Sequence, residues 1–308
     1  MPTSVPPATR SHSVTLSQPA MVGGVTLFTA AAASLIIRPA PAGHGIVFRR
    51  TDLPDQPRIP ALVRHVVPES RHTVLSADPA NRAAPVIHTV EHVLSALAGL
   101  GITDALLDLH GQEVPIGDGS AAPFVQALQE AGVRRVAADG PMPEPIVVRE
   151  PITVTDARGD GRIEALPPLP GEQALDLSYD LDYGPNSPLP PQRATLRLDA
   201  AGGADAYAAQ IAPARTFCLA EEAQAMRKMG FFKHLEPKDM LVIGEDGRPI
   251  DNALRFPDEP ARHKLLDLLG DLSLTGRPII GRITASRSGH ALNHEMARKL
   301  LAHAGVCG

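Results

Sequence analysis

Two side chains able to bind a metal ion, His263 and Asp267, lie four residues apart in a leucine-rich run. At about 100° per residue, a helix over residues 262–271 would carry both on one face and leucines such as Leu265 on the opposite face. An imidazole and a carboxylate one turn apart can reach a single metal ion. Gly270, on the same polar face, would let another segment approach closely. On this motif alone, a His–Asp pair on a solvated helix face is the favoured interpretation. If the pair does bind a metal ion, the remaining ligands must come from elsewhere in the chain.

A second histidine with an acidic neighbour, His92 beside Glu91, lies in residues 86–100. The apolar residues of this segment recur with the period of an amphipathic helix, for which Thr89 is a candidate N-cap and Gly99 a candidate end. His92 would point away from the apolar stripe, and Glu91 would lie at its edge. On this segment alone, an ordinary pair of surface side chains is the favoured interpretation.

Together, His92, His263 and Asp267 have the composition of a catalytic zinc site, in which two histidines and one carboxylate leave a fourth position open for water. Glu91, next to one of these ligands, is placed to act as the general base that takes a proton from the water. Spacing alone does not prove that the two segments meet. The set is therefore a hypothesis about the tertiary structure.

A third histidine, His290, follows a Ser-Gly pair and could take part in the same chemistry. Asp271, one helical turn beyond Asp267, could orient its imidazole. Such a histidine would serve as a general acid or as the positive charge that faces a developing oxyanion. Lys264 and Thr216 are further candidates for polarising a carbonyl group.

The composition is that of a globular protein, with 44% apolar and 20% charged residues in 308. A net charge of −5 argues against a nucleic-acid partner held by bulk electrostatics. Two cysteines, Cys218 and Cys307, make neither a disulfide framework nor a cysteine-based zinc site, and they fit a reducing, cytoplasmic location.

Residues 1–20 are rich in Ser, Thr and Pro, and we expect them to form a disordered tail. The uncharged stretch 21–37 is short for a membrane span, contains two adjacent glycines and lacks a basic cluster before it. We therefore predict a hairpin with strands at 25–28 and 33–37, and no integral membrane segment.

The pattern of elements predicts an α+β protein of two similarly folded domains, each a sheet with two helices, packed face to face with the active site between them. The N-terminal α+β domain would span residues 21–140. The C-terminal one would span residues 141–308 and carry an insert around 217–240. Each half is expected to have several strands, a histidine-bearing helix, a strand and a closing helix. The predicted strands are 45–49, 103–109, 146–155, 161–166, 174–181, 194–198 and 278–285, and the other predicted helices are 122–131, 204–211, 221–229 and a last one ending near 304.

Several motifs resemble the bacterial UDP-3-O-acyl-N-acetylglucosamine deacetylases, the zinc-dependent deacetylase family of lipid A biosynthesis. They occur in the family's order between about residues 21 and 302. The motifs are RPAPAG at 38–43, RRTD at 49–52, TVEH at 89–92, PIGDGSAAPF at 115–124, ARTF at 214–217, HKLLDLLGD at 263–271 and SGHALN at 288–293.

The resemblance implies two α+β domains around one zinc ion per chain and the committed, hydrolytic step of lipid A synthesis. Its substrate is a UDP-linked acylated glucosamine, from which the enzyme releases acetate, and we expect the protein to be a monomer. Carried over by position, the zinc ligands are His92, His263 and Asp267, the base is Glu91, the acid or electrostatic partner is His290 held by Asp271, the residues at the reacting carbonyl are Lys264 and Thr216, and the sugar site includes Phe217.

Two departures affect the predicted substrate more than the chemistry. The family usually has a histidine near the first hairpin turn, where this chain has Phe28, and a Gly-Gly-Ser in the second insert, where this chain has 234–236 (HLE). The alternatives are a zinc amidohydrolase acting on a different N-acylated amino sugar and a non-catalytic acyl sugar-nucleotide-binding paralogue. The intact Glu91, His290 and Asp271 argue against the paralogue.

Large apolar side chains gather after Phe217 in a chain with only 3% aromatic residues. They could line a groove for the acyl chain, or they could be a helix that packs on the core of the second half. The sequence does not decide between these two interpretations. The residues are Leu219, Met226, Met229, Phe231 and Phe232.

Overall fold

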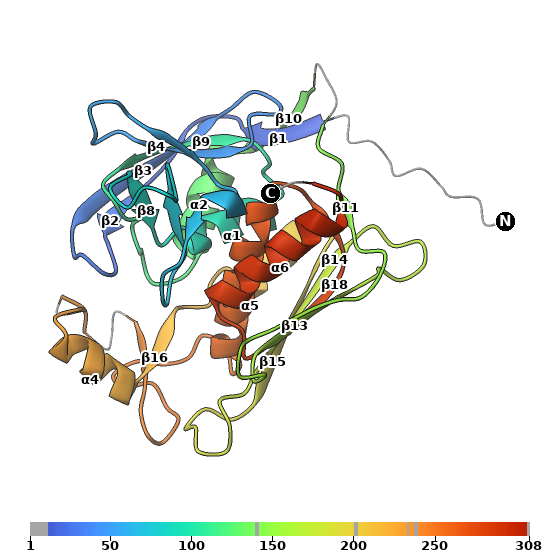
Figure 1. Ribbon diagram of the computed structural model, residues 1–308. Helices are drawn as coiled ribbons and strands as arrows, with labels where there is room; N and C mark the ends of the chain where they lie inside the picture. Colours follow the sequence, from blue (N-terminus) through green and yellow to red (C-terminus); the bar gives the residue numbers. More distant parts are fainter. Residues whose placement is uncertain (1–11, 139–141, 200–202, 233, 237–239, 307–308) are drawn as a thin grey trace.

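The structure is a computed structural model that describes residues 12–138, 142–199, 203–232, 234–236 and 240–306. Its secondary structure is mixed α+β, as predicted. Figure 1 shows α1 (Glu91–Gly99), α5 (Glu259–Leu272) and α6 (His290–His303) between strands of the two halves of the chain. No helix among the described residues combines the length and apolarity needed to cross a membrane.

The first half builds a sheet of strands in the order β2-β3-β9-β4-β5. Only β9 and β4 in this order run parallel; the other neighbours are antiparallel. Alternate residues of β3, among them Leu35 and Ile37, are buried, as the period of two in a strand requires. The elements are β2 (Ala20–Val25), β3 (Ala32–Pro39), β4 (Ile46–Arg50), β5 (Arg58–Pro60), β9 (Ala105–His110), α1 (Glu91–Gly99) and α2 (Ala122–Ala131).

The second half builds a sheet in the order β12-β13-β18-β14-β15, with β11 paired in parallel to β18. In this order β18 and β14 run parallel, and the other neighbours are antiparallel. The parallel pair has the same place in the order as β9 and β4 in the first sheet, so both sheets share one topology. Helices α5 and α6 contact this sheet (Figure 1). The elements are β11 (Ile146–Val147), β12 (Ile152–Thr155), β13 (Arg162–Leu166), β14 (Leu175–Leu181), β15 (Gln192–Leu198), β18 (Ile279–Ser286), α5 (Glu259–Leu272) and α6 (His290–His303).

Helices α1 and α5 pack directly against each other, and Gly270 is the reason that they can. A β-carbon at this position would lie 2.2 Å from the carbonyl oxygen of Glu91. The predicted close approach at Gly270 is confirmed. The polar face of α5 is buried against α1, so the interpretation of this face as solvated is wrong.

Two smaller units lie beside the main sheets. An antiparallel sheet of β6 (Val66–Val67), β7 (Val74–Ser76) and β8 (Val86–His88), preceded by the short helix η1 (Val63–His65), comes before α1. In the second half, α3 (Gly203–Gln210) precedes β16 (Phe217–Leu219), α4 (Ala220–Lys228) and β17 (Leu241–Ile243), and β16 and β17 pair in parallel. The short helix η2 (Ser273–Thr275) follows α5.

Three local predictions are wrong at the N-terminal side. Residues 12–16 do not belong to a disordered tail, because they form β1 (His12–Leu16), which pairs with β10 (Val133–Ala137). The rest of that prediction, residues 1–11, lies outside the described residues. The first hairpin strand is β2, not residues 25–28, because the chain turns after Val25. Thr89 does not cap α1: its φ is 59°, and its hydroxyl donates to Glu113.

Candidate active site

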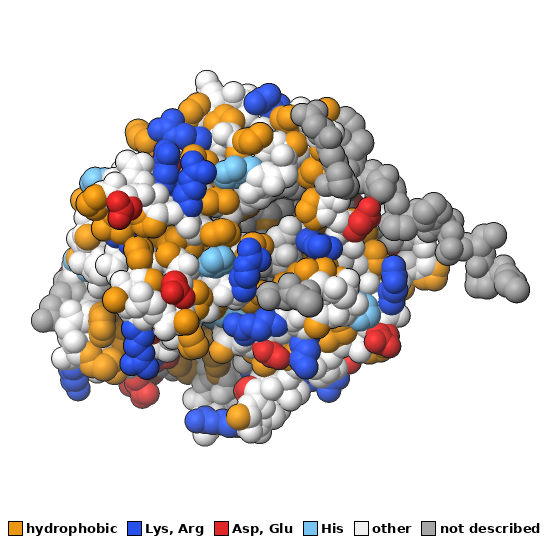
Figure 2. Space-filling model, turned by 45° about the horizontal axis from the view of Figure 1, so that its top comes forward, with side chains coloured by type: hydrophobic (Ala, Val, Ile, Leu, Met, Phe, Trp, Pro, Cys, Tyr) orange, Lys and Arg blue, Asp and Glu red, His pale blue; other side chains and the backbone are white. Residues whose placement is uncertain are grey.

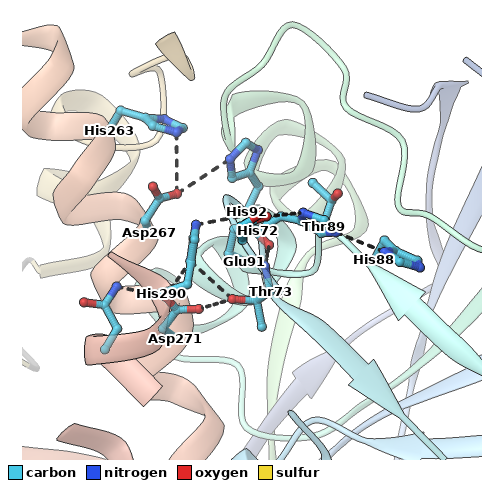
Figure 3. Close-up of polar contacts among 12 residues, drawn as sticks. His72, Thr73, His88, Thr89, Glu91, His92, His263, Asp267, Asp271 and His290 are labelled. Atoms are coloured by element: carbon cyan, nitrogen blue, oxygen red, sulfur yellow. Dashed lines mark hydrogen bonds and ion pairs between the residues drawn. The ribbon is translucent and has the colours of Figure 1, made fainter. Parts of the chain in front are cut away.

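The two predicted helices bring His92, His263 and Asp267 together. Asp267 Oδ1 lies 3.5 Å from His263 Nε2 and 3.8 Å from His92 Nε2 (Figure 3). One ligand atom from each of the three residues lies within 4.8 Å of the others. All three side chains are buried, so the interpretation of His92 and Glu91 as a surface pair is wrong.

The protonation of this cluster suits a metal ion. Burial lowers the pKa of His92 to about 3, helped by the neighbouring His263, and burial also lowers the pKa of His263. Burial opposes ionisation of Asp267, but the adjacent His263 and the ammonium of Lys264 hold its pKa below the usual range. Two neutral imidazoles and a carboxylate are the forms in which these residues bind zinc.

The orientation of the cluster also fits a metal ion. His263 Nδ1 is 3.0 Å from the carbonyl oxygen of Ala214, which leaves Nε2 directed at Asp267. Asp267 Oδ1 is buried yet has no hydrogen-bond partner among the described residues. A buried carboxylate oxygen without a partner is costly unless a cation faces it. The donor set therefore fits zinc.

Glu91 lies next to this cluster at the start of α1, where it is almost fully buried. Its Oε1 lies 3.9 Å from His290 Nε2, and its Oε2 accepts a hydrogen bond from the backbone N–H of Thr73. Burial raises the pKa of Glu91 to about 8, although the charge of His290 opposes the shift. A carboxyl whose pKa lies near neutrality can take up a proton readily.

His290, at the first position of α6, donates from Nδ1 to Asp271 Oδ2 at 2.8 Å. Burial lowers the pKa of this imidazole, but the charge of Asp271 and the hydrogen bond to it outweigh burial and raise the pKa to about 9. His290 is therefore held as a cation whose Nε2 faces Glu91 (Figure 3).

The other predicted residues line the same cavity, which has a volume of about 870 Å³. Lys264 Nζ lies 3.0 Å from Asp267 Oδ2 and 5.9 Å from the ring centre of Phe217. Burial lowers the pKa of Lys264, but the charge of Asp267 raises it further, so the ammonium persists. Thr216 is held by its backbone N–H, which donates to Gly119 at 2.7 Å. Asp271 lies behind His290 and outside the lining.

The large apolar residues after Phe217 divide between the two interpretations. Leu219 and Phe232 line the cavity. Met226 packs in a small core cluster, to which Phe232 also belongs, while Met229 and Phe231 are exposed. The cavity wall is completed by other apolar side chains, namely Leu27, Phe28, Cys218 and Met240.

Sequence reasoning missed several polar groups around the site. Thr73 contacts both Glu91 and Asp271, and His294 also contacts Asp271. His72, which lies 3.0 Å from His88, stacks against Phe28 with ring centres 4.3 Å apart. Thr73 lies in a stretch without helical or strand periodicity, so no local signal marked it.

Two histidines and a carboxylate on a large cavity, faced by a buried carboxyl and an imidazolium, define a metal-dependent hydrolase. The family model "LpxC: UDP-3-O-acyl N-acetylglycosamine deacetylase" matches residues 13–302. The chain belongs to this family, and the resemblance in the motifs is confirmed.

Curated relatives agree over nearly the whole chain. A UDP-3-O-acyl-N-acetylglucosamine deacetylase of Myxococcus xanthus is 40% identical over 297 residues, which cover 93% of this chain and 85% of the relative. A protein of the same name from an Anaeromyxobacter species is 41% identical over 92% of this chain and 86% of its own length. Another, from Citrifermentans bemidjiense, is 37% identical over 93% of this chain and 88% of its own length.

Proposed function

We propose that this protein hydrolyses the N-acetyl amide of UDP-3-O-acyl-N-acetylglucosamine in the cavity beside α1 and α5 and releases acetate. The family assignment makes the chain a deacetylase of lipid A biosynthesis. The observation that carries the location of the site is the convergence of His92 with His263 and Asp267 from the other half of the chain. These residues would hold one zinc ion per chain.

Zinc bound in such a site polarises a carbonyl oxygen and lowers the pKa of a water to about 7. Glu91 is the base that accepts the proton of the attacking water. His290, kept cationic by Asp271, stabilises the developing oxyanion or donates its Nε2 proton to the departing amine. Lys264 and Thr216 lie at the cavity wall where the acetyl carbonyl would sit.

The two ends of the substrate would lie against different parts of the cavity. Phe217, which lies 6.4 Å from the His263 ring, is placed to contact the sugar. The apolar wall that contains Phe28, Leu219 and Phe232 suits the acyl chain. This proposed placement favours the UDP-3-O-acylated sugar over an amino sugar that carries no acyl chain.

We also infer that the two sheet-and-helix units are separate domains, about residues 21–140 and 141–308, with the active site between them. Their common strand order supports this division. A site completed within one chain fits a monomer, and a cytoplasmic location fits the two-cysteine composition. On the face shown in Figure 2, basic side chains are interspersed with apolar ones. We propose no nucleic-acid partner for this protein.

The test is acetate release from the UDP-linked substrate by the purified protein, with and without a chelator. We expect turnover that the chelator abolishes and added zinc restores. Glu91→Gln serves as the control for contaminating activity, because it should retain zinc and lose most of the rate. Full turnover after verified removal of zinc would overturn the proposed chemistry.

A further inference from the structure

Asp271 is a fully buried carboxylate with four donors around its two oxygens. Oδ2 accepts from His290 Nδ1 at 2.8 Å and from Asn293 Nδ2 at 2.9 Å. Oδ1 accepts from the Thr73 hydroxyl at 2.5 Å and from His294 Nε2 at 3.2 Å. An ionised carboxylate offers about four lone-pair positions, so these donors hold Asp271 in one orientation.

The proton positions in this network follow from the acceptor at its centre. The Thr73 hydroxyl has one proton and gives it to Asp271, which can only accept. Towards His294 Nε2, 3.0 Å away, the Thr73 oxygen must then be the acceptor. His294 therefore carries a proton on Nε2, and both imidazoles, His290 and His294, donate towards Asp271.

The backbone of Thr73 is tied to the other half of the site. Its N–H donates to Glu91 Oε2 at 3.1 Å, and its carbonyl accepts from the N–H of Thr89 at 3.0 Å. Thr73 thus has a fixed position relative to the start of α1, which carries Glu91. Its hydroxyl then reaches Asp271 on α5 (Figure 3).

We propose that Thr73 is a positioning residue of the deacetylase reaction, which couples the base Glu91 to the Asp271–His290 pair. Its main chain fixes Glu91 and its hydroxyl fixes Asp271, so the separation of base and imidazolium depends on this one residue. His294 supports the same carboxylate oxygen from α6. The proposal rests on the deacetylase function proposed above.

The decisive comparison is Thr73→Val with Thr73→Ser. Valine keeps the size and the backbone N–H but removes the donor to a buried charge, so we expect kcat to fall about 10- to 100-fold. KM should change by less than about twofold and zinc content should remain at the wild-type value, because the ligands and cavity wall are untouched. Thr73→Ser, which retains the hydroxyl, should recover most of kcat.

Thr275→Val is the matched control. Thr275 is also buried, and its hydroxyl donates within the turn after α5, to Leu272 or Arg277 oxygen at 3.0 Å, away from the cavity. This variant should lower thermal stability without changing kcat. A Thr73→Val enzyme with wild-type kcat, or a Thr73→Ser enzyme as slow as Thr73→Val, would overturn the proposal.

A second pair covers the case in which Thr73→Val does not fold. His294→Gln keeps an N–H donor near the position of Nε2, so its kcat should remain close to that of the wild type. His294→Leu lacks this donor, so its kcat should fall by about the same factor as that of Thr73→Val. Equal kcat in this pair would count against the coupling. Turnover of the wild type, measured in the same assay, distinguishes failure of the proposed function from failure of the positioning role. An inactive wild type overturns the proposed function. An active wild type whose kcat is matched by these variants overturns only the positioning role.

Discussion

At the scale of single residues, the proposed roles in metal binding and in proton transfer fall on histidines with opposite pKa shifts. The histidines of the metal cluster have lowered pKa values and are neutral, whereas His290 has a raised pKa and is cationic. The difference follows from the neighbours, because His290 alone among them donates to the ionised Asp271. The environment thus suits His92 and His263 to the proposed metal binding and His290 to the proposed charge stabilisation.

The first prediction concerns the metal ligands. His263→Ala should remove most of the bound zinc, because one of the three ligands is lost. The fold should persist, since α5 keeps its buried leucines. Metal analysis of the purified variant, with circular dichroism to follow folding, gives the result. Wild-type zinc content in the variant would rule out His263 as a ligand.

The second prediction concerns proton transfer. Glu91→Gln and His290→Gln should each lose about 10² to 10⁴ in rate, the usual cost of removing a general acid or base. Both should keep their zinc, unlike His92→Ala. Steady-state kinetics on samples of known zinc content make the comparison. Near-wild-type turnover of Glu91→Gln would show that another group is the base.

At the scale of elements, the site depends on how closely α1 and α5 approach. Gly270→Ala would place a β-carbon 2.2 Å from the Glu91 carbonyl oxygen, so the two helices must separate. Overpacking of this kind costs about 1–3 kcal/mol or more in stability. We expect a lower melting temperature together with loss of zinc affinity and rate, because the ligands are divided between these helices.

Gly23→Ala is the control for this change. Its nearest neighbour would be the carbonyl oxygen of Ala33 at 3.8 Å, an ordinary contact, so stability and rate should remain close to those of the wild type. Differential scanning calorimetry and zinc titration compare the two variants. Equal zinc affinity in both would mean that the contact between α1 and α5 does not control the site.

The unit of β16, α4 and β17 supplies the prediction about the acyl chain. Burial of about five methylenes at about 0.8 kcal/mol each would contribute roughly 4 kcal/mol, a factor of about 10³ in kcat/KM over a substrate without the 3-O-acyl chain. Phe232→Ala, which changes the cavity wall, should reduce this ratio by weakening only the acylated substrate.

Phe231→Ala is the neighbouring control, because Phe231 is 41% exposed and lies outside the residues that line the cavity. For this variant, the ratio of kcat/KM for the acylated substrate to kcat/KM for the substrate without the 3-O-acyl chain should equal the wild-type ratio. Equal values for the two substrates on the wild-type enzyme would show that these residues form no acyl groove. An amino sugar without the acyl chain would then become the better candidate substrate.

At the scale of the whole molecule, the two halves contain sheets of the same topology, and the proposed zinc ligands come from one helix of each half, α1 and α5. Zinc that binds only the folded chain stabilises it by about 2.7 kcal/mol at a free concentration 100 times Kd. For a protein of 308 residues, with an unfolding entropy of about 2.1 cal/mol/K per residue, that corresponds to a rise in Tm of roughly 4 °C. Chelation should therefore lower the Tm of the wild type.

His92→Ala should remove this dependence on zinc, since one half then contributes no ligand. The comparison is a pair of melting curves for each protein, with and without chelator. A wild-type Tm that does not respond to chelation would count against a metal ion that joins the two halves.

Local pattern was sufficient for much of the secondary structure. The helix at 122–131 agrees residue for residue with α2, and α5 extends the predicted helix at 262–271 by a few residues at its start. Apolar periodicity is a property of neighbouring residues, so a linear sequence contains it. The first hairpin was misplaced because the uncharged residues 21–37 contain little alternation to set the register.

The sequence by itself determined which residue types could act, the i, i+4 pair His263 and Asp267, and the family to which the chain belongs. Only the tertiary structure decided that His92 meets this pair, that the polar face of α5 is buried, and that Thr73 joins Glu91 to Asp271. These contacts span 18 to 198 positions along the chain. No periodicity encodes such distances, because they arise when the two halves of the chain pack and bring the polar faces of their helices together.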